Sequence, residues 1–472
     1  MKVSDPLLDA WGKTLAEKGD SPAVFDETGT VLRTFRQVEV RSEDFGTELN
    51  QFQPGTVIGV QLGNHPDWPS VFLACLRRQL VTVPLDRSIS AQERDAAIEI
   101  CRASGVINGS ANESGNGDGV TPRLSRFERG PVDWGKNPPR LLKLTSGTTA
   151  APRAIRFRSE QLIADCVQIC DTMGITETDF NFGVIPISHS YGFSNLLTPL
   201  LVRGVALVLS NDRLPRAVIA NLDRAGATVF AGMPVFYQAF AEMRDVPPMR
   251  KLRLCISAGA PLSTTVARRF REKFRLSVHS FYGSSECGGI CYDRNADNAD
   301  DGFVGTALDG VEIELIDANA KTGQIRVRSA AVGDGYFPGP NEAKLGHGEF
   351  VPDDLLTKSE KGWKIVGRVS DLINVAGKKV NPAEVESELL NVSGVREAVV
   401  FGRTSSLRHQ EVAACVVANS DVSENDLLKI CRQRLSGWQV PKRIFMLDEL
   451  PVNERGKISR RELAAQFADD KR

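Results

Sequence analysis

Residues 144–153, Leu-Thr-Ser-Gly-Thr-Thr-Ala-Ala-Pro-Arg, place four hydroxyl side chains, a glycine, a proline and a cation within ten positions. Backbone N–H groups, hydroxyl donors and a positive charge suit an anion with several oxygens. Phosphate is therefore the predicted ligand, and a solvated Ser/Thr turn is the alternative. The run is not a Walker loop, because the pattern G-x-x-x-x-G-K-[ST] does not occur in the sequence.

Three other segments place small or polar residues directly after a short apolar run. The runs at 227–230, 252–256 and 277–281 are predicted to be strands. Ligands of α/β sheets bind beyond the carboxyl ends of the strands. One shared crevice is therefore predicted at the turns that follow, which are Ala-Gly-Met-Pro at 231–234, Ser-Ala-Gly-Ala-Pro at 257–261 and Tyr-Gly-Ser-Ser-Glu at 282–286.

The elements that must position these segments alternate between strands and helices. Strands are predicted at 57–62 and 80–85, on either side of a helix at Trp68–Arg77. This alternation favours an α/β fold with largely parallel strands. Residues 108–139 are rich in Gly, Asn, Ser and Pro and are predicted to form a long surface connection. Further predicted elements are strands at 141–144, 154–157 and 205–209, a helix that Ser159 caps and Gly174 ends, and a helix at 263–274.

Beyond residue 302 the pattern changes. Residues 311–316 and 324–327 alternate polar and apolar side chains, which indicates an antiparallel β segment. After a break at 367–371, Asn381-Pro-Ala-Glu384 has the residues of a helix start. Strands at 398–401, 413–417 and 443–447 and a helix opened by Ser423 complete a small α+β domain.

Length and composition exclude several classes of protein. A chain of 472 residues is too long for one core. The net charge of −1 provides no field that attracts nucleic acid or an anionic membrane. The most apolar stretch, 196–209, is interrupted by Pro199 and Arg203, so no transmembrane span is predicted, and the N-terminus lacks a signal-peptide pattern. The nine scattered cysteines indicate reduced, mostly buried thiols and a cytoplasmic protein.

Six spaced motifs together resemble one family. They are Thr145-Ser-Gly-Thr-Thr149, Tyr282-Gly-Ser-Ser-Glu286, Asp354 in the acidic turn 353–355, Gly367-Arg368 with Asp371, Gly377, and Gly456-Lys457. In this order they resemble the adenylate-forming (AMP-binding) superfamily of acyl-CoA synthetases, firefly-type luciferases and peptide-synthetase adenylation domains, over nearly the whole chain. The resemblance implies a large N-terminal domain with mostly parallel sheets plus a β segment, 1–370, that binds ATP and the acid. A hinge would join it to a small, mobile C-terminal α+β domain, 371–472.

The resemblance also implies a reaction. ATP and a carboxylic acid form an acyl-AMP and pyrophosphate, and the site must supply positive charge and fixed donors because carboxylate and triphosphate repel one another. Lys457, His189 and Thr145 are the implied catalytic residues. Lys457 would bridge the substrate carboxylate and the α-phosphate region, and His189 would lie near the acid's carboxylate. A packing His in a turn and a solvated lysine are the alternatives.

The implied ligands are ATP, Mg²⁺ and CoA. Thr145 to Thr149 would hold the β- and γ-phosphates, Asp354 the ribose hydroxyls, and Glu286 the Mg²⁺, a hard cation that accepts a carboxylate plus phosphate oxygens. Arg368 would lie near the ribose and phosphates, and Gly377 would line a pantetheine tunnel. The implied nucleotide- and CoA-binding set is Thr145, Ser146, Gly147, Thr148, Thr149, Arg153, Ala258, Gly259, Ala260, Pro261, Tyr282, Gly283, Ser285, Asp354, Arg368 and Gly377.

The chain departs from the family pattern in three places. Ala150 replaces a glycine, which matters if the loop needs a positive φ there. Arg153 replaces a lysine and keeps the charge but not the compact ammonium. Ser285 replaces a threonine and keeps the hydroxyl. A non-catalytic nucleotide- or acyl-binding homologue is therefore one alternative, although Lys457, Glu286 and Asp354 argue against it.

The predicted enzyme is an AMP-forming acid–thiol ligase. The first candidate is a fatty acyl-CoA synthetase of fatty acid metabolism. An aryl-CoA ligase, or a ligase that loads a carrier-protein phosphopantetheine, is the alternative. No Asp or Glu occurs between Phe180 and Asn211 to pair with an amino acid's ammonium, and the segment 230–234 is apolar. An uncharged aliphatic chain, medium to long, is therefore predicted. An aryl acid is second, because Phe193, Phe230 and Tyr191 could flank a ring.

Overall fold

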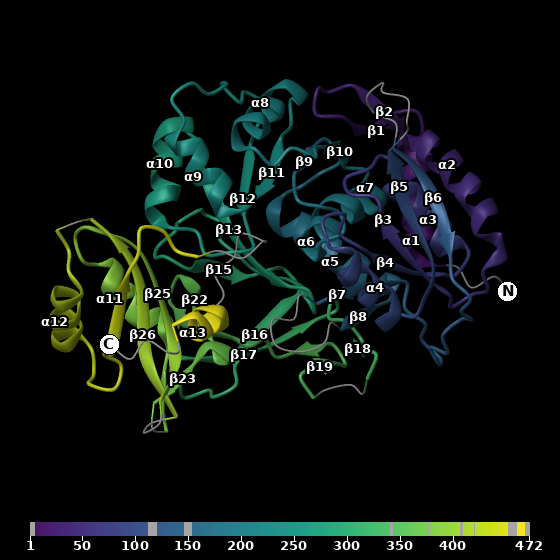
Figure 1. Ribbon diagram of the computed structural model, residues 1–472. Coiled ribbons are helices and arrows are strands. Elements are labelled where there is room, and N and C mark those ends of the chain that lie inside the picture. The colour runs from purple at the N-terminus through teal and green to yellow at the C-terminus, as the bar shows by residue number, and fades with distance from the viewer. Residues whose placement is uncertain are drawn as a thin grey trace. The chain divides into compact units, whose positions relative to one another are not determined.

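The computed structural model describes residues 5–111, 120–145, 153–339, 343–375, 377–405, 409–419, 421–451 and 460–467, and the chain divides into two compact units. The larger unit comprises Met1–Glu314, Arg326–Pro352 and Ser359–Lys364. The smaller unit comprises Leu315–Ile325, Asp353–Lys358 and Ile365–Arg472. The boundary at 370/371 stays a prediction. Figure 1 shows the α/β construction, which confirms the predicted fold class.

One sheet of the larger unit carries the strand that precedes the hydroxyl run. Its strand β4 pairs in parallel with β7, and β7 pairs antiparallel with β8, so the strands predicted at 141–144 and 154–157 are confirmed and form a hairpin. The helix α4 (Ala91–Ile100) packs on this sheet through Ala97 and Ile98. The strand order is β18 (Gly335–Phe337), β8 (Ala154–Phe157), β7 (Leu141–Leu144), β4 (Val81–Pro84), β3 (Val57–Gln61), β5 (Ala103–Ala111) and β6 (Val120–Arg126).

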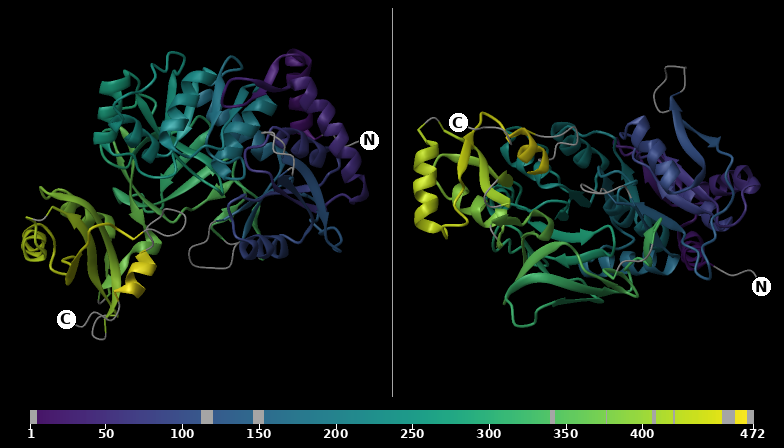
Figure 2. Two further views of the ribbon diagram at one scale, coloured as in Figure 1. Left: turned by 45° about the horizontal axis from the view of Figure 1, so that its top comes forward. Right: turned by 60° about the horizontal axis from the view of Figure 1, so that its bottom comes forward.

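The predicted surface connection at 108–139 is wrong in its first part. Strand β5 runs through Ala111 in parallel with β3, and β6 pairs antiparallel with β5 at the sheet edge (Figure 2). Polar and Gly-rich residues there concealed two strands, because an edge strand needs no continuous apolar run. Pro122 is compatible with this place, since proline is tolerated on edge strands.

The second sheet of the larger unit brings the predicted strand ends together. Strands β9, β11, β12 and β13 lie side by side in parallel. Helices α8, α9 and α10 cover one face (Figure 1), where Ile219, Phe240 and Phe270 join the core. The order is β15 (Phe303–Ala307), β14 (Gly288–Tyr292), β13 (Val278–Ser284), β12 (Leu254–Ser257), β11 (Val229–Gly232), β9 (Phe180–Gly183), β10 (Ala206–Leu209), β1 (Pro22–Phe25) and β2 (Val31–Thr34).

The three helices predicted in the larger unit begin and end close to the predicted positions. Gly174 ends α5 in the left-handed conformation as predicted, but Arg158 is its N-cap and Ser159 is its first residue. The predicted helix at 263–274 is confirmed as α10, which begins one residue later because Ser263 is its N-cap, without a side-chain capping bond. The helices are α1 (Pro6–Lys18), α2 (Phe35–Glu48), α3 (Trp68–Arg77), α5 (Ser159–Met173), α6 (Ser190–Gly192), α7 (Thr198–Arg203), α8 (Pro215–Ala225), α9 (Pro234–Glu242) and α10 (Thr264–Phe274), with a π-helical turn at Phe193–Leu197 between α6 and α7.

The segment after residue 302 is antiparallel, as predicted. Strand β17 pairs antiparallel with both β20 and β21. The strands are β16 (Val311–Leu315), β17 (Thr322–Ser329), β19 (Leu345–Gly346), β20 (Glu349–Phe350), β21 (Asp354–Ser359) and β22 (Gly362–Arg368).

The smaller unit is built on a mixed sheet with helices against it. Asn381 caps α11, accepting from the Ala383 N–H, with Pro382 at the first helical position as predicted. Val385, Val400 and Leu427 belong to its core. The elements are β23 (Ile373–Val375), β24 (Lys378–Val380), α11 (Pro382–Leu390), β25 (Val395–Ser405), β26 (His409–Ala418), α12 (Glu424–Arg434), β27 (Arg443–Met446) and α13 (Arg460–Gln466).

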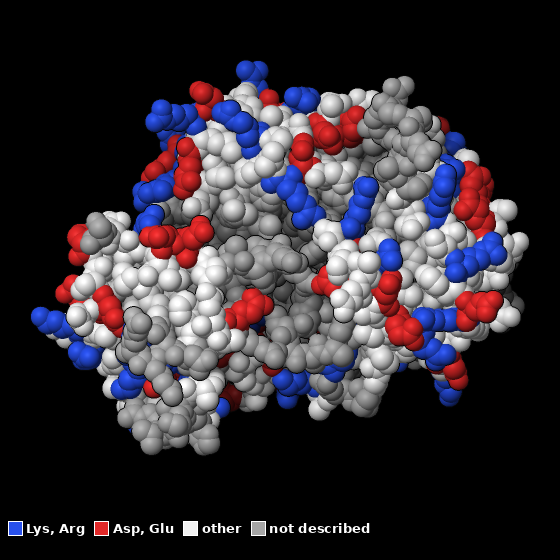
Figure 3. All heavy atoms as spheres, viewed as in Figure 1, with Lys and Arg blue, Asp and Glu red and all other residues white. Residues whose placement is uncertain are grey.

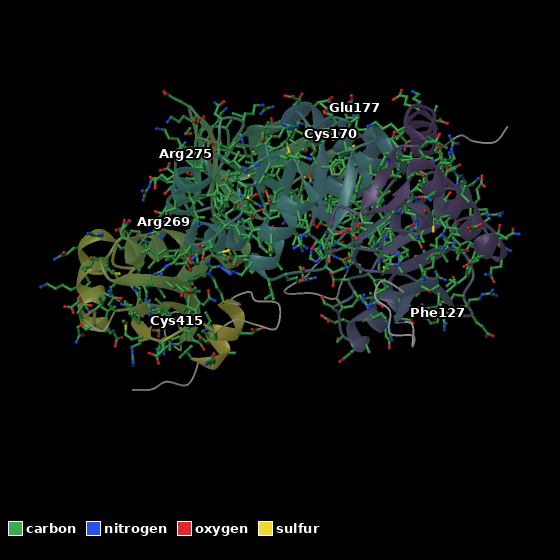
Figure 4. All side chains as sticks on the ribbon, turned by 90° about the horizontal axis from the view of Figure 1, so that it is seen from above. Phe127, Cys170, Glu177, Arg269, Arg275 and Cys415 are labelled. Carbon is green, nitrogen blue, oxygen red and sulfur yellow. The ribbon has the colours of Figure 1, made fainter. Side chains whose placement is uncertain are left out.

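The cysteines and the surface agree with the composition. All nine cysteines are unpaired and buried, including Cys170 and Cys415, which Figure 4 labels. Basic and acidic side chains are interspersed over the face in Figure 3. Within the described ranges, no helix has the length and apolar character needed to cross a membrane.

A buried cation lies in β7, two residues before the hydroxyl run. Lys143 is 4% exposed, and its Nζ donates to Ser194 Oγ at 3.2 Å and lies 4.7 Å from the centre of the Phe157 ring. Burial lowers the pKa of Lys143, although the charge of Asp165 opposes this shift. The charged form is therefore less favourable in the folded chain than in water.

We expect Lys143→Met to raise the free energy of unfolding by about 1–3 kcal/mol near neutral pH, because an apolar side chain of similar length replaces a buried charge. Below the lowered pKa both the folded and the unfolded lysine are charged, so the full difference is present. The difference fades as the pH rises towards the ordinary lysine pKa of about 10.4. Denaturant titrations of both proteins across this range measure it. The exposed Lys136→Met is the control, and an equal gain there would contradict the explanation.

Candidate active site

The hydroxyl run is closed at its neck by its first and last polar residues. Both the backbone N–H and Oγ1 of Thr145 donate to the carbonyl oxygen of Arg153, at 2.8 and 3.0 Å. This contact continues the β7–β8 ladder and fixes where the run begins and ends. The predicted phosphate-binding residues between them, Ser146, Gly147, Thr148 and Thr149, lie outside the described residues, as does Ala150.

Tyr336 connects the end of this run to Glu286. The Arg153 guanidinium lies over the Tyr336 ring, 4.2 Å from its centre, and the Tyr336 hydroxyl donates to Glu286 Oε1 at 3.2 Å. Tyr336 reaches this place because β18 pairs antiparallel with β8, opposite Ile155. Sequence reasoning missed Tyr336, since this pairing joins strands that are far apart in the chain and β18 is very short.

Glu286 lies in the tight connection between β13 and β14. Its carbonyl accepts from the Gly333 N–H at 2.9 Å. The predicted turn at 282–286 is partly wrong, because Tyr282 and Gly283 are still in strand β13, and only Ser285 and Glu286 belong to the turn. Gly283 permits the close pairing there, since a Cβ on it would lie 2.6 Å from the Gly288 carbonyl oxygen. Tyr282 is buried.

The segment after β12 lies beside the end of β11, as predicted. Ala258 is buried, and its N–H donates to the Gly232 carbonyl at 3.0 Å. Gly259 has φ +84°, a conformation that favours glycine, and it is exposed together with Ala260 and Pro261. Residues 232, 257 and 284 are therefore the carboxyl ends of three adjacent strands of one sheet.

The turn that carries His189 is held from several sides. The Asn64 side chain accepts from the Ile187 N–H at 2.9 Å, and the Ser190 hydroxyl donates to Ser285 Oγ at 2.9 Å. His189 itself precedes the short helix α6. The Ser190–Ser285 contact places the His189 turn next to the turn that carries Glu286.

His189 contacts a carboxylate from a distant part of the chain. Its Nε2 lies 3.2 Å from Asp86 Oδ2, and the His189 side chain is 60% exposed while that of Asp86 is 16% exposed. The hydrogen bond from His189 holds the pKa of the Asp86 carboxyl well below its usual range, against the effect of burial. The search for acidic residues between 180 and 211 could not find Asp86, which follows strand β4.

Of the three aromatic residues predicted to flank a ring, two are core residues. Phe193 packs edge-on against Phe72, and Phe230 packs among the aromatic residues of α9. Both are 1% exposed. Tyr191 instead stacks on Phe281 with ring centres 5.0 Å apart. The Phe193 and Phe230 side chains therefore pack in the interior of the protein.

The smaller unit brings two of its predicted site residues together. Arg368 Nε donates to Asp354 Oδ1 at 2.8 Å, and Asp354 is the first residue of β21 rather than part of a turn. Asp371 accepts from Arg460 at 2.7 Å. Gly377 has φ +86°, as the tight β23–β24 connection requires. Lys457 lies outside the described residues.

Comparison with known proteins decides the family. The family model described as AMP-binding enzyme matches residues 12–337, and that of the AMP-binding enzyme C-terminal domain matches residues 384–457. The chain belongs to the family of AMP-binding enzymes. This membership confirms the predicted resemblance and the predicted class, an AMP-forming acid–thiol ligase.

Relatives of this AMP-binding enzyme match over nearly its whole length. The feruloyl-CoA synthase of Amycolatopsis sp is 28% identical over 490 residues, covering 98% of this chain and 99% of that protein. The benzoate–CoA ligase of Thauera aromatica is 24% identical over 492 residues, covering 94% and 93%. The crystal structure of ATP-bound MatB from Rhodopseudomonas palustris has the same fold, with a TM-score of 0.83, 23% identity and coverage of 98% and 99%.

In this AMP-binding enzyme, the close approach of Gly192 to Pro186 fixes the His189 turn. A Cβ on Gly192 would lie 2.0 Å from the Pro186 carbonyl oxygen. We expect Gly192→Ala to lower the free energy of unfolding by about 1–3 kcal/mol, the usual cost of overpacking, and to reduce activity because the turn must shift. Thermal unfolding and initial rates measure both effects.

The control for Gly192→Ala is Gly12→Ala in helix α1, where a Cβ meets nothing within 4 Å. Alanine should be neutral or stabilising there, by about 0.5–1 kcal/mol. If Gly192→Ala matched this control in both stability and rate, the turn would not depend on the contact with Pro186.

Proposed function

We propose that this enzyme uses ATP to activate a carboxylic acid whose acyl chain is uncharged, and that it transfers the acyl group to CoA. In the first step a carboxylate oxygen attacks the α-phosphorus, the bond from that phosphorus to the β-phosphate bridge breaks, and pyrophosphate leaves. In the second step the thiol sulfur bonds to the acyl carbon, AMP leaves and the thiol proton passes to solvent. The observation that carries the proposal is the chain of contacts from Thr145 through Arg153 and Tyr336 to Glu286.

The ATP-binding roles are distributed over the two units. In the larger unit, Thr145 and Arg153 stand at the neck of the run that would hold the β- and γ-phosphates. Ser146, Gly147, Thr148 and Thr149 would supply its donors. Ala258, Gly259, Ala260, Pro261, Tyr282, Gly283 and Ser285 would surround the adenine and the α-phosphate. Fixed donors and a cation at this place would stabilise the charge that develops as pyrophosphate leaves.

Glu286 fits a magnesium ion held mainly by ATP. Mg²⁺ is usually bound through one or two carboxylates together with phosphate oxygens and water. The described residues contain no cluster of three or more acidic, His or Cys side chains that could form an all-protein metal site. Glu286, beside the neck of the run, supplies the single carboxylate that this mode needs. Bound Mg²⁺ would neutralise part of the charge on the phosphates.

In the smaller unit, Asp354 would accept from the ribose hydroxyls and Arg368 would lie near the ribose and phosphates. Lys457 would bridge the acid and the α-phosphate. Gly377 would leave room for pantetheine. Lys378, whose Nζ lies 3.7 Å from the centre of the exposed Trp438 ring, offers a cation and an aromatic face to the nucleotide of CoA.

The acyl chain of the acid is proposed to be uncharged, with an aliphatic chain as the first candidate. Met233 is 46% exposed at the end of β11 and adds apolar surface. An aryl acid is the second candidate. It is favoured by the stacked pair Tyr191–Phe281 and by relatives named feruloyl-CoA synthase and benzoate–CoA ligase. Asp86 lies beside His189, so amino acids belong in the test as well.

Acid-dependent exchange of labelled pyrophosphate into ATP tests the first step. We expect exchange with octanoate or palmitate to exceed that with benzoate and 4-coumarate, with acetate and free amino acids weakest. A preference for 4-coumarate would select the aryl candidate, and a preference for an amino acid would contradict the uncharged acid. Absence of exchange with every acid would contradict the catalytic proposal. Product assays with CoA and with a phosphopantetheinylated carrier protein then identify the acceptor.

Lys457→Ala separates the two steps. Removing one charge-stabilising donor should slow adenylation by on the order of 10²–10³-fold. Thioester formation from a supplied acyl-adenylate should continue at nearly the original rate, because that step needs no bridge between carboxylate and triphosphate. Single-turnover assays of each half-reaction measure this, with Lys136→Ala as the control. Equal loss in both steps would contradict the role of Lys457.

A further inference from the structure

Asp86 is fixed before it meets His189. It follows strand β4, and its backbone carbonyl accepts from Gln61 Nε2 at 3.0 Å. One carboxylate oxygen, Oδ1, accepts from the Ser88 N–H at 2.8 Å and from the Ser88 hydroxyl at 2.5 Å. These contacts close a turn on the carboxylate and set its direction.

The other oxygen, Oδ2, faces the His189 turn. It accepts from the Ser188 hydroxyl at 3.2 Å and lies 3.2 Å from His189 Nε2. One oxygen of the Asp86 carboxylate therefore contacts its own turn, and the other contacts the His189 turn. The exposed imidazole is held by its Nε2 edge, while Ser190 ties the next residue to Ser285.

We propose that Asp86 is a positioning residue for His189 in the adenylation step. This inference rests on the function proposed above, in which His189 lies at the acid's carboxylate. An ionised carboxylate only accepts hydrogen bonds, so its partner on the neutral imidazole must be the Nε2–H tautomer. Nδ1 is then left as the accepting nitrogen of the ring. A hydrogen bond on one ring nitrogen decides what the other can do.

Asp86→Asn tests this arrangement with minimal change of shape. The amide can keep an acceptor on Ser88, but it then turns a donor towards Nε2, which selects the opposite tautomer. We expect the acid-dependent exchange rate to fall by about 10–100-fold, the scale found when an orienting partner is removed. The KM for ATP should stay unchanged, because Asp86 has no role at the phosphates.

A double-mutant cycle separates positioning from simple support of the turn. If Asp86 acts through His189, Asp86→Asn should cause no further loss once His189→Ala is present. Losses that multiply would overturn the proposal. Ser188→Ala removes the other contact to Oδ2 and should retain the exchange rate within about two-fold, since it leaves the imidazole contact intact. A loss as large as that of Asp86→Asn would make the carboxylate a support of the turn only, and would overturn the proposal.

Asp26→Asn is the matched control. Asp26 also closes a turn through one carboxylate oxygen, which accepts from the Thr28 and Thr30 N–H groups at 2.8 and 2.9 Å, but it lies in the β1–β2 connection. Its substitution should leave exchange unchanged. A loss equal to that of Asp86→Asn would indicate a general effect of removing turn carboxylates and would overturn the proposal.

Nitrogen NMR of the full-length chain labelled in its five histidines gives a readout that needs no turnover. The His189 signals, identified by their loss in His189→Ala, should show the Nε2–H tautomer in the original protein and shift in Asp86→Asn. An unchanged tautomer would overturn the proposal. If the original protein exchanges pyrophosphate but His189→Ala is fully active, the role of His189 and this proposal both fail while acid activation stands. Absence of exchange in the original protein fails the function and the adenylation role together.

Discussion

The contact of Tyr336 with both Arg153 and Glu286 is the interaction on which the rest of the candidate site depends. Arg153 belongs to the sheet that contains β7 and β8, whereas Glu286 belongs to the connection between β13 and β14 in the other sheet. Tyr336 therefore connects the two sheets of the larger unit through one contact on each side. Because its hydroxyl donates to a carboxylate, the contact is stronger than a bond between neutral groups.

Buried polar groups around this contact constrain it further. The carboxylate of Asp165, on helix α5, accepts from the Gly289 N–H at 3.0 Å and so fixes the start of β14. Lys143, on β7, lies two residues before Thr145, and the charges of Asp165 and Glu286 act on it. Taking a charge from water is costly, and the neighbouring carboxylates offset only part of this cost for Lys143, because its pKa stays lowered. The interior of the larger unit thus contains charged side chains, Lys143 and Asp165, as well as apolar ones.

The sequence was sufficient for elements with strong local signals and insufficient for contacts between distant segments. The helix at Trp68–Arg77 and the caps at Gly174 and Asn381 follow from residue type and spacing. Strands β5 and β6 escaped prediction because pairing, not composition, stabilises an edge.

Within the candidate site, the sequence motifs predicted where the loops begin. The contact of Tyr336 with Glu286 depends instead on the pairing of β18 with β8. Likewise, the turn after β4 brings the Asp86 side chain into contact with His189. Neither contact has a signature in local sequence, since each partner is far away along the chain. The hydroxyl run was recognisable as a candidate because its residue types themselves predict the binding of an anion.

The Asn64 side chain connects segments of the larger unit through contacts that do not involve the side chains of those segments. It binds the carbonyl oxygens of Gly183 and Ser210 at 2.9 Å, and the Ile187 N–H at 2.9 Å. All of these partners are backbone groups, so the alignment of the segments does not depend on which side chains they carry. Substitutions in these segments, which would surround the acid in the proposed site, can therefore accumulate while the frame around residue 189 persists. Libraries that aim to change the acid should therefore vary the neighbours of Asn64 and leave Asn64 itself unchanged.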